Sequence, residues 1–141
     1  MINERNLDGK GMIFGRISSY AAKRALLGET VNIYNCEEIV ITGNKQRMLD
    51  DYPKKRKFTG QMGKGPFRPR RADLMLKRRI RGMIPYESIR GREALARIKF
   101  WIGMPESQIT LERFEQADMK RLTTQKYLTI KELSRLLGGK I

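Results

Sequence analysis

The chain has 141 residues with 30 Lys and Arg, 15 Asp and Glu, no His and one Cys, and its net charge is +15. The absence of histidine excludes Ser-His-Asp and Cys-His nucleophile systems, and a single cysteine excludes an internal disulfide, a CxxC redox pair and a zinc cluster. Because these catalytic and metal-binding systems are excluded, we expect a protein that is not an enzyme, with no catalytic residue, metal site or cofactor. A hydrophobic content of 40% fits one domain with a real core.

The first third of the chain predicts alternating helices and strands. Apolar residues at three- and four-residue steps indicate a helix that Gly28 ends, with a stripe formed by Ile13, Ile17, Tyr20, Ala21 and Ala25. Two short β-branched runs follow, at residues 31–34 and 39–41, and predict strands. Residues 44–52 predict a short helix that ends before Pro53.

Residues 52–71 form a basic segment without helical or strand periodicity, which we call the arm. Three prolines and three glycines interrupt it, and isolated aromatic residues lie between its cations. A structureless loop of this length within a compact domain is unusual unless it has a function or becomes ordered on a partner. A simple linker is the alternative. We favour an arm that is mobile in the free protein and ordered on RNA.

After the arm, Asp73 is placed to cap a helix that runs to about Arg81, before Gly82 and Pro85. A second helix is expected at residues 90–97. A closing strand is expected at 99–102, where the apolar surroundings favour a core position for Trp101 over a base-stacking role. We expect one core cluster to contain Ile17, Ile33, Val40, Ile41, Ile80 and Phe100.

The tail predicts one more helix. Thr129 and Glu132 have capping-box spacing, leucines follow them, and Gly138 and Gly139 end the pattern. Such a small amphipathic helix must pack on the body of the protein or on a neighbouring protein. Strands alternating with helices predict an α/β fold around a parallel or mixed sheet, with a helical C-terminal extension.

Four local motifs carry weaker signals. Gly9, Gly11 and Gly15 resemble a loosened dinucleotide fingerprint, but the preceding residues make a poor buried strand, so a turn is the better interpretation. Residues 60–67 have P-loop spacing but lack its Lys and its hydroxyl residue. Residues 42–45 could form an anion site at a helix start or a plain strand-to-helix turn. Cys36 is expected to be a small core residue.

The excess positive charge is concentrated in the middle of the chain. Residues 45–99 carry 18 Lys and Arg and 5 Asp and Glu, so 13 of the 15 excess charges lie there. A single-sign block of this kind is typical of a protein that binds a polyanion, although a solvated basic face is the simpler alternative. Nucleic acid is the first candidate and an anionic membrane the second.

No apolar run exceeds three residues, so no segment spans a bilayer. The N-terminus also lacks a signal-peptide pattern, and we expect a cytoplasmic protein without a membrane partner or a small-molecule substrate.

RNA fits this pattern better than DNA, because no recognition helix or dimer seam is evident and arms suit irregular RNA. The alternative is a general RNA- or DNA-binding architectural protein. The candidate RNA-binding residues are Arg16, Lys23, Lys45, Arg47, Lys54, Lys55, Arg56, Lys57, Lys64, Arg68, Arg70, Arg71, Lys77, Arg78, Arg81, Arg90 and Arg92.

Several blocks of sequence resemble the family of large-subunit ribosomal protein thirteen. They occur in the family's order between about residues 7 and 104, with the arm in the family's place: Asp8-Gly9 before Gly15-Arg16, Val40–Lys45, Arg81–Pro85, Gly91–Leu95 and Ile98–Gly103. The arm's Gly65-Pro66-Phe67 with Arg70-Arg71 and the added tail are similar to the archaeal and eukaryotic branch. One departure is the polar opening at Asn3–Asn6, where the family has an apolar strand.

The resemblance implies a three-layer α/β/α fold around a four-stranded sheet. It implies a structural constituent of the large ribosomal subunit that binds large-subunit ribosomal RNA, supports subunit assembly and contacts neighbouring ribosomal proteins. The α/β domain is expected at residues 1–104, including the arm, and a helical extension docked on it at 105–141. The first strand is expected to be short, at an edge or poorly ordered.

Overall fold

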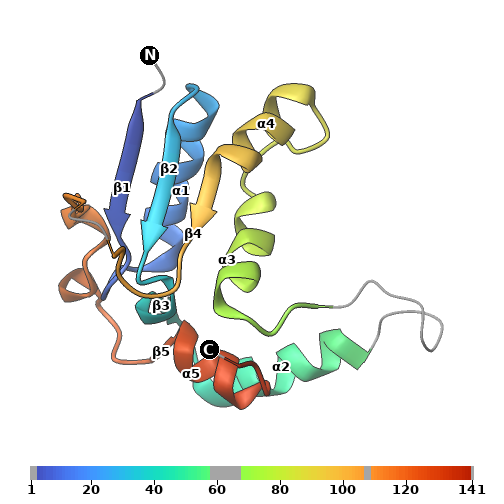
Figure 1. Cartoon of the computed structure of the whole chain (residues 1–141). Coiled ribbons are helices and arrows are strands. Elements are labelled where there is room, and N and C mark those ends of the chain that lie inside the picture. The colour runs from blue at the N-terminus through green and yellow to red at the C-terminus, as the bar shows by residue number, and fades with distance from the viewer. Residues whose placement is uncertain (1–2, 58–67, 107–108, 141) are drawn as a thin grey trace.

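A computed structural model describes residues 3–57, 68–106 and 109–140, and Figure 1 shows its mixed α/β architecture. The side chains of residues 55–57 are outside this description. Its strands and α-helices are β1 (Glu4–Asp8), α1 (Phe14–Leu26), β2 (Thr30–Tyr34), β3 (Val40–Thr42), α2 (Lys45–Lys57), α3 (Ala72–Arg81), α4 (Ile89–Arg97), β4 (Ile98–Phe100), β5 (Tyr127–Thr129) and α5 (Ile130–Leu136).

The main sheet has three parallel strands in the order β1-β2-β4. β3 pairs instead with β5 in a separate antiparallel ladder, in which Ile41 lies opposite Leu128. The expectation of one four-stranded sheet is therefore wrong for the described residues. The reason is that the C-terminal extension supplies a strand for β3, and nothing in the local sequence of residues 39–41 specifies that pairing. β1 is five residues long and lies at the edge of the sheet, as expected.

The two faces of the main sheet differ. Val31 and Ile33 of β2 are fully buried and point to the side on which α1 contacts α3 and α4. Asn32 and Lys99, which are partners in the register, point to the opposite side. No helix of the described residues lies over that side (Figure 1). The helices that contact this sheet thus lie on one face, and the described residues show no second helical layer of the kind that a three-layer arrangement requires.

Trp101 is the clearest departure from the sequence-based expectations. Its side chain is 48% exposed, although a core position was expected. Ile98 and Phe100 of β4 alternate into the core, so Lys99 and Trp101 point to the face that no described helix covers. A short apolar run does not reveal which of its alternate residues will be covered.

Helix α1 confirms the predicted stripe, and Gly28 follows it in the left-handed region with φ +99°. The expectation for α2 is wrong, because this helix continues through Pro53 to Lys57. Met48, Leu49 and Tyr52 pack against the core from α2, and this burial offsets the hydrogen bond that proline cannot donate. The first six residues of the arm are therefore helical, and the remaining residues up to 67 lie outside the described part of the chain.

Helices α3 and α4 occupy the predicted places but begin differently. Arg71 is the N-cap of α3, but its side chain does not bond a backbone amide of the first turn. Asp73 lies in that turn and accepts hydrogen bonds of 2.7 and 3.2 Å from the Arg71 guanidinium. Asp73 is thus not the cap, although its charge suits the start of a helix. Ser88 caps α4 by accepting the Gly91 amide at 3.0 Å, and Gly82 ends α3.

The C-terminal helix packs on the body of the protein. Thr129 Oγ1 accepts the Glu132 amide at 3.3 Å, as the capping-box spacing predicts, and Gly138 has φ +78° after the helix. Ile130 and Leu133 are buried in the same cluster as the rest of the core. The Ser134 hydroxyl donates to the Arg70 carbonyl at 2.6 Å, so the extension holds the described end of the arm.

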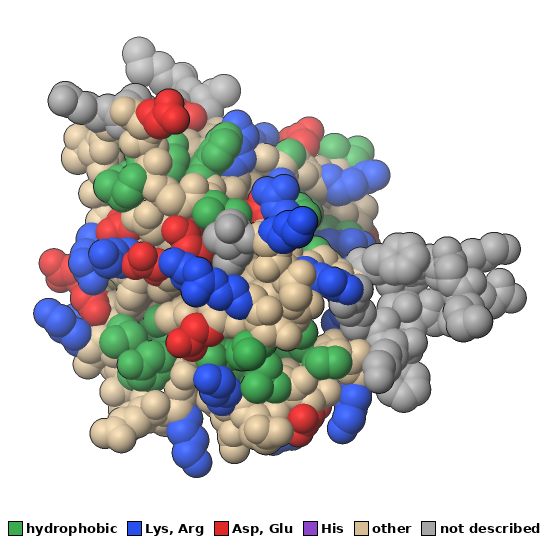
Figure 2. All heavy atoms as spheres, turned by 60° about the horizontal axis from the view of Figure 1, so that its bottom comes forward, with side chains coloured by type: hydrophobic (Ala, Val, Ile, Leu, Met, Phe, Trp, Pro, Cys, Tyr) green, Lys and Arg blue, Asp and Glu red, His purple; other side chains and the backbone are tan. Residues whose placement is uncertain are grey.

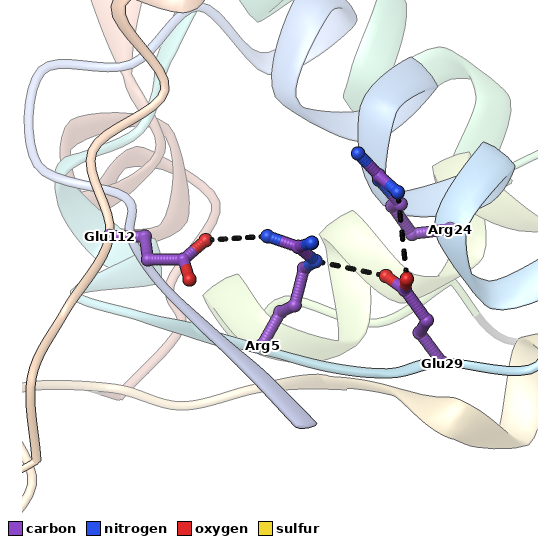
Figure 3. A network of polar contacts seen from close by, with 4 residues as sticks. All are labelled: Arg5, Arg24, Glu29 and Glu112. Atoms are coloured by element: carbon purple, nitrogen blue, oxygen red, sulfur yellow. Dashed lines mark hydrogen bonds and ion pairs between the residues drawn. The ribbon is translucent and has the colours of Figure 1, made fainter. Parts of the chain in front are cut away.

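A polar network secures the exposed edge of the sheet (Figure 3). Arg5 of β1 donates to Glu29 at 2.9 Å and to Glu112 at 3.0 Å, and Glu29 also lies 3.5 Å from Arg24. The hydrogen bonds to Glu29 and Glu112 raise the pKa of the Arg5 guanidinium. The backbone of Glu112 pairs with Asn6 and Asp8, which shields the free edge of a short polar strand.

The core and the tight turn at its edge follow the predictions. Ile17, Ile33, Ile41, Ile80 and Phe100 share one hydrophobic cluster, and Val40 is also buried. Cys36 is fully buried, and burial raises the pKa of its thiol to about 12, which leaves it unreactive. A Cβ on Gly9 would lie 2.7 Å from the Tyr34 carbonyl, and Gly11 has φ +67°, so these glycines shape a turn.

Candidate nucleic-acid interface

Three arginines surround a hollow at the described end of the arm. Arg68, Arg78 and Arg79 line it together with Tyr52, Pro69 and Met75, and it encloses about 200 Å³. The Arg79 guanidinium lies 5.1 Å from the centroid of the Tyr52 ring and donates to the Tyr52 hydroxyl. Burial raises the pKa of the Tyr52 phenol, so this hydroxyl stays protonated at neutral pH. The hollow combines a fixed guanidinium with an apolar floor.

A second hollow begins on the other side of Arg79. It encloses about 450 Å³ and is lined by the first turn of α1, β3 and the end of α3, including Arg16, Thr42 and Met83. Arg16 donates to the Gln116 carbonyl at 3.0 Å, which orients its guanidinium. Since Arg79 borders both hollows, it joins the start of α1 to the described end of the arm in one cationic surface.

The arm's end is held against the body by its backbone. Besides the bond from Ser134, a Cβ on Gly139 would lie only 2.6 Å from the Arg70 carbonyl, so the C-terminal segment packs directly on it. Arg71 is already paired with Asp73 in the first turn of α3. This anchoring gives Arg68 and Arg70 a defined point of attachment, although both side chains are exposed.

The other predicted residues are dispersed. Lys45, Arg47 and Lys54 are exposed on α2, and Arg81 lies 4.0 Å over the ring of Tyr86. A separate group lies at the end of the molecule where α1 ends and α4 begins: Arg90 donates to the Leu26 carbonyl at 3.0 Å, and Lys23 and Arg92 are exposed on these helices. The side chains of Lys55, Arg56 and Lys57, and all of Lys64, are outside the described residues.

Figure 2 shows several Lys and Arg side chains towards the right of the view, whereas on the left Lys and Arg are mixed with Asp and Glu. Residues 42–45 offer fewer free backbone amides than an anion site at the start of α2 would require. Asn44 Oδ1 accepts the Gln46 amide at 3.0 Å, so one of the free amides at the start of α2 is already used by the chain. The plain strand-to-helix turn is the better description there.

Arg79 and Tyr52 line the first hollow but are not among the candidate residues found from the sequence. Arg79 belongs to the basic run of α3 and directly precedes the core residue Ile80, whereas the candidates chosen from this helix were Lys77, Arg78 and Arg81. Tyr52 was expected at the end of a helix over residues 44–52 and at the start of the arm, and nothing local indicated that the helix would place it opposite Arg79. The basic run itself was the available signal.

Metal-binding groups and membrane-spanning helices can be assessed for residues 3–57, 68–106 and 109–140. No group of three or more His, Cys, Asp or Glu residues is placed to hold a metal ion there. Within the same ranges, no helix is both long and apolar enough to cross a membrane.

The sequence of this chain is similar to ribosomal proteins of one family. The family model of ribosomal protein L13 matches residues 3–107. The chain belongs to the ribosomal protein L13 family. The large ribosomal subunit protein uL13 of Methanococcoides burtonii is 43% identical over 136 residues, covering 95% of this chain and 97% of the relative. The proteins of the same name from Methanopyrus kandleri and Methanocaldococcus jannaschii are 42% and 41% identical; they cover 94% and 95% of this chain, and 85% and 97% of their own lengths. These L13-family relatives are archaeal, in agreement with the branch that the arm and tail indicated.

Proposed function

We propose that this chain is a structural, non-catalytic constituent of the large ribosomal subunit in the cytoplasm. In this role it binds large-subunit ribosomal RNA, supports subunit assembly and contacts adjacent ribosomal proteins. The names of its relatives support the subunit assignment, and the basic surface supports RNA as the ligand. The α/β domain comprises residues 1–104 with the arm at 52–71, and residues 105–141 form the extension docked on it. No cofactor or small-molecule substrate is required.

The observation that carries the proposal is that Arg79 borders two neighbouring hollows, one lined also by Arg16 and the other also by Arg68 and Arg78. Cations held at fixed positions bind RNA phosphates with a more favourable free energy. Binding releases counterions from the RNA, and no long side chain has to be ordered. Arg79 is fixed by Tyr52, and Arg16 by the Gln116 carbonyl, so their guanidinium forks are directed before RNA arrives. The arm adds lysines and arginines that can enter the spaces between RNA segments.

A guanidinium and an ammonium would differ at this surface. Arginine binds phosphate through two parallel N–H donors and can stack on a base, whereas lysine acts as a point charge. Replacing Arg79 by Lys therefore keeps the charge and removes the fork. We expect the preference for ribosomal RNA over bulk RNA to fall, with little change in salt dependence.

Filter binding at several salt concentrations tests the proposal, with large-subunit RNA, bulk RNA and duplex DNA as ligands. We expect tight, salt-sensitive binding to large-subunit RNA. Arg79→Gln should lower the logarithmic salt slope by about 0.7 to 1 for one lost phosphate contact. Arg121→Gln, which removes an exposed arginine on the C-terminal segment, is the matched control. Equal affinity for duplex DNA would favour the general architectural protein instead, and absence of RNA binding would contradict the proposal.

A further inference from the structure

Trp101 forms an exposed aromatic surface whose position is set by the fold. Its amide donates to the Ile33 carbonyl at 2.8 Å, and its carbonyl accepts the Cys36 amide at 3.1 Å, so the backbone is tied to β2 and to the turn that follows it. Its ring lies at 14° to that of Tyr34, with centroids 6.3 Å apart. Tyr34 is buried, whereas 48% of Trp101 is exposed. A stacked, exposed indole of this kind can accept a further ring at little entropic cost.

A hollow of about 230 Å³ lies beside this indole, between α3 and β4. Trp101, Phe100 and Leu74 supply its apolar lining, and Leu74 is itself 47% exposed. This volume is below the roughly 300–1,000 Å³ of sites for drug-sized ligands. The hollow therefore suits a single ring system that enters from solvent.

Two lysines flank the same hollow. Lys77 reaches it from α3 and Lys99 from β4, and neither forms an ion pair within the described part of the chain. The remaining charged residue, Asp73, is bound by Arg71 at 2.7 Å. The site thus presents two uncompensated cations beside an aromatic platform. A flat ring joined to an anion matches this chemistry, and a nucleotide is such a ligand.

The hollow is separate from the arginine surface described above. Asp73, Leu74 and Lys77 of α3 line it, whereas Met75, Arg78 and Arg79 of the same helix line the hollow at the described end of the arm. Its lining residues come from α3 and from β4 with the residue after it, and Figure 1 shows these two elements side by side. RNA contacts here would add to those around Arg79 without sharing side chains.

We propose that this hollow binds one unpaired nucleotide of RNA, with the base stacked on Trp101 and the phosphates held by Lys77 and Lys99. The inference rests on the proposed function, because RNA is the ligand in both. It adds a base-stacking site to a surface that otherwise recognises phosphate. Stacking is tolerant of base identity, so the site selects an accessible, unpaired nucleotide more than a particular sequence.

Trp101 is the only tryptophan of the chain, so its fluorescence reports on this site directly. Large-subunit RNA and short single-stranded oligonucleotides are titrated into the full-length protein, with emission and RNA binding measured in parallel. We expect quenching that follows binding, and Trp101→Ala should weaken oligonucleotide binding about tenfold. Trp101→Tyr, which keeps an aromatic ring, should recover most of that loss. Circular dichroism verifies that the variants are folded.

The lysines are tested without altering the fluorophore. Lys77→Gln with Lys99→Gln should weaken quenching by oligonucleotides several-fold and lower the salt slope, whereas Lys126→Gln, an exposed lysine on the C-terminal segment, should not. If ribosomal RNA binds while Trp101 emission and the affinity of Trp101→Ala stay unchanged, the nucleotide site is refuted and the proposed function stands. Quenching by an acidic peptide but not by oligonucleotides would also refute it, in favour of a protein partner. Failure of all RNA binding would refute both proposals.

Discussion

The two faces of the β1-β2-β4 sheet differ in burial, and residues 98–101 show the contrast within four residues. Ile98 and Phe100 are buried against the helices, whereas Lys99 and Trp101 lie on the side that no described helix covers. Burial on one face stabilises the fold, so the residues on the other face are free to serve binding. Changes on the two faces should therefore affect different measurements: unfolding on the covered side, and RNA affinity on the open side.

The largest expected effect is the loss of a core aromatic residue. Phe100→Ala removes a buried ring and leaves a cavity, and should lower the free energy of unfolding by about 3–5 kcal/mol. Lys99→Ala, its neighbour on the other face, should change stability by no more than about 0.5 kcal/mol. Urea unfolding of both variants measures the difference. Similar losses for the two would show that the open face is also structural.

Because packing on the covered side is tight, adding a side-chain atom there should also lower the stability. A Cβ on Gly91 would lie 1.9 Å from the Pro85 carbonyl oxygen, so Gly91→Ala must separate α4 from the preceding loop. We expect a loss of about 1–3 kcal/mol. Gly15→Ala is the control, because a Cβ there meets no atom within 4 Å and Ala favours a helix by up to about 1 kcal/mol. Thermal unfolding that ranks these variants in the opposite order would contradict the packing described.

Cys36 is buried in the core, and its thiol should make the free energy of unfolding fall as the pH rises above neutrality. Burial raises the pKa of its thiol to about 12, above the roughly 8.5 of an unfolded cysteine. The folded state therefore keeps the proton longer, and this contribution is complete below pH 8.5 and declines as the pH rises towards 12. Between pH 9 and 10 the protein should lose about 1 kcal/mol more than Cys36→Ala. Parallel losses in urea titrations would show that the thiol is accessible.

The smallest expected effect is at the edge of the sheet. Arg5→Gln removes the ion pairs with Glu29 and Glu112, and should lower stability by about 0.5 kcal/mol because the Arg5 side chain is partly exposed. High salt should reduce the difference between the variant and the unchanged protein. Chemical denaturation with urea at low and high sodium chloride measures it, and a loss that persists in salt would indicate packing by the arginine stem instead.

Local sequence was sufficient where the chain's own periodicity and caps decide the structure. The apolar stripe of α1, the β-branched residues of β2 and the Thr129 cap of α5 all lie where they were expected. Each depends on residues within one or two turns of each other, so no distant segment was needed. The blocks of family resemblance likewise indicated the family correctly, whereas the RNA partner that the charge indicated stays a prediction.

Tertiary structure decided what depends on distant segments. Pro53 stays within α2 because Met48, Leu49 and Tyr52 pack on the core, and this packing places Tyr52 against Arg79. β3 takes its partner from the C-terminal extension, more than eighty residues away in the chain. Trp101 is exposed because the helices that pack on the sheet lie on its other face. Side-chain periodicity specifies that alternate residues differ, but only the packing of distant elements determines which set is covered.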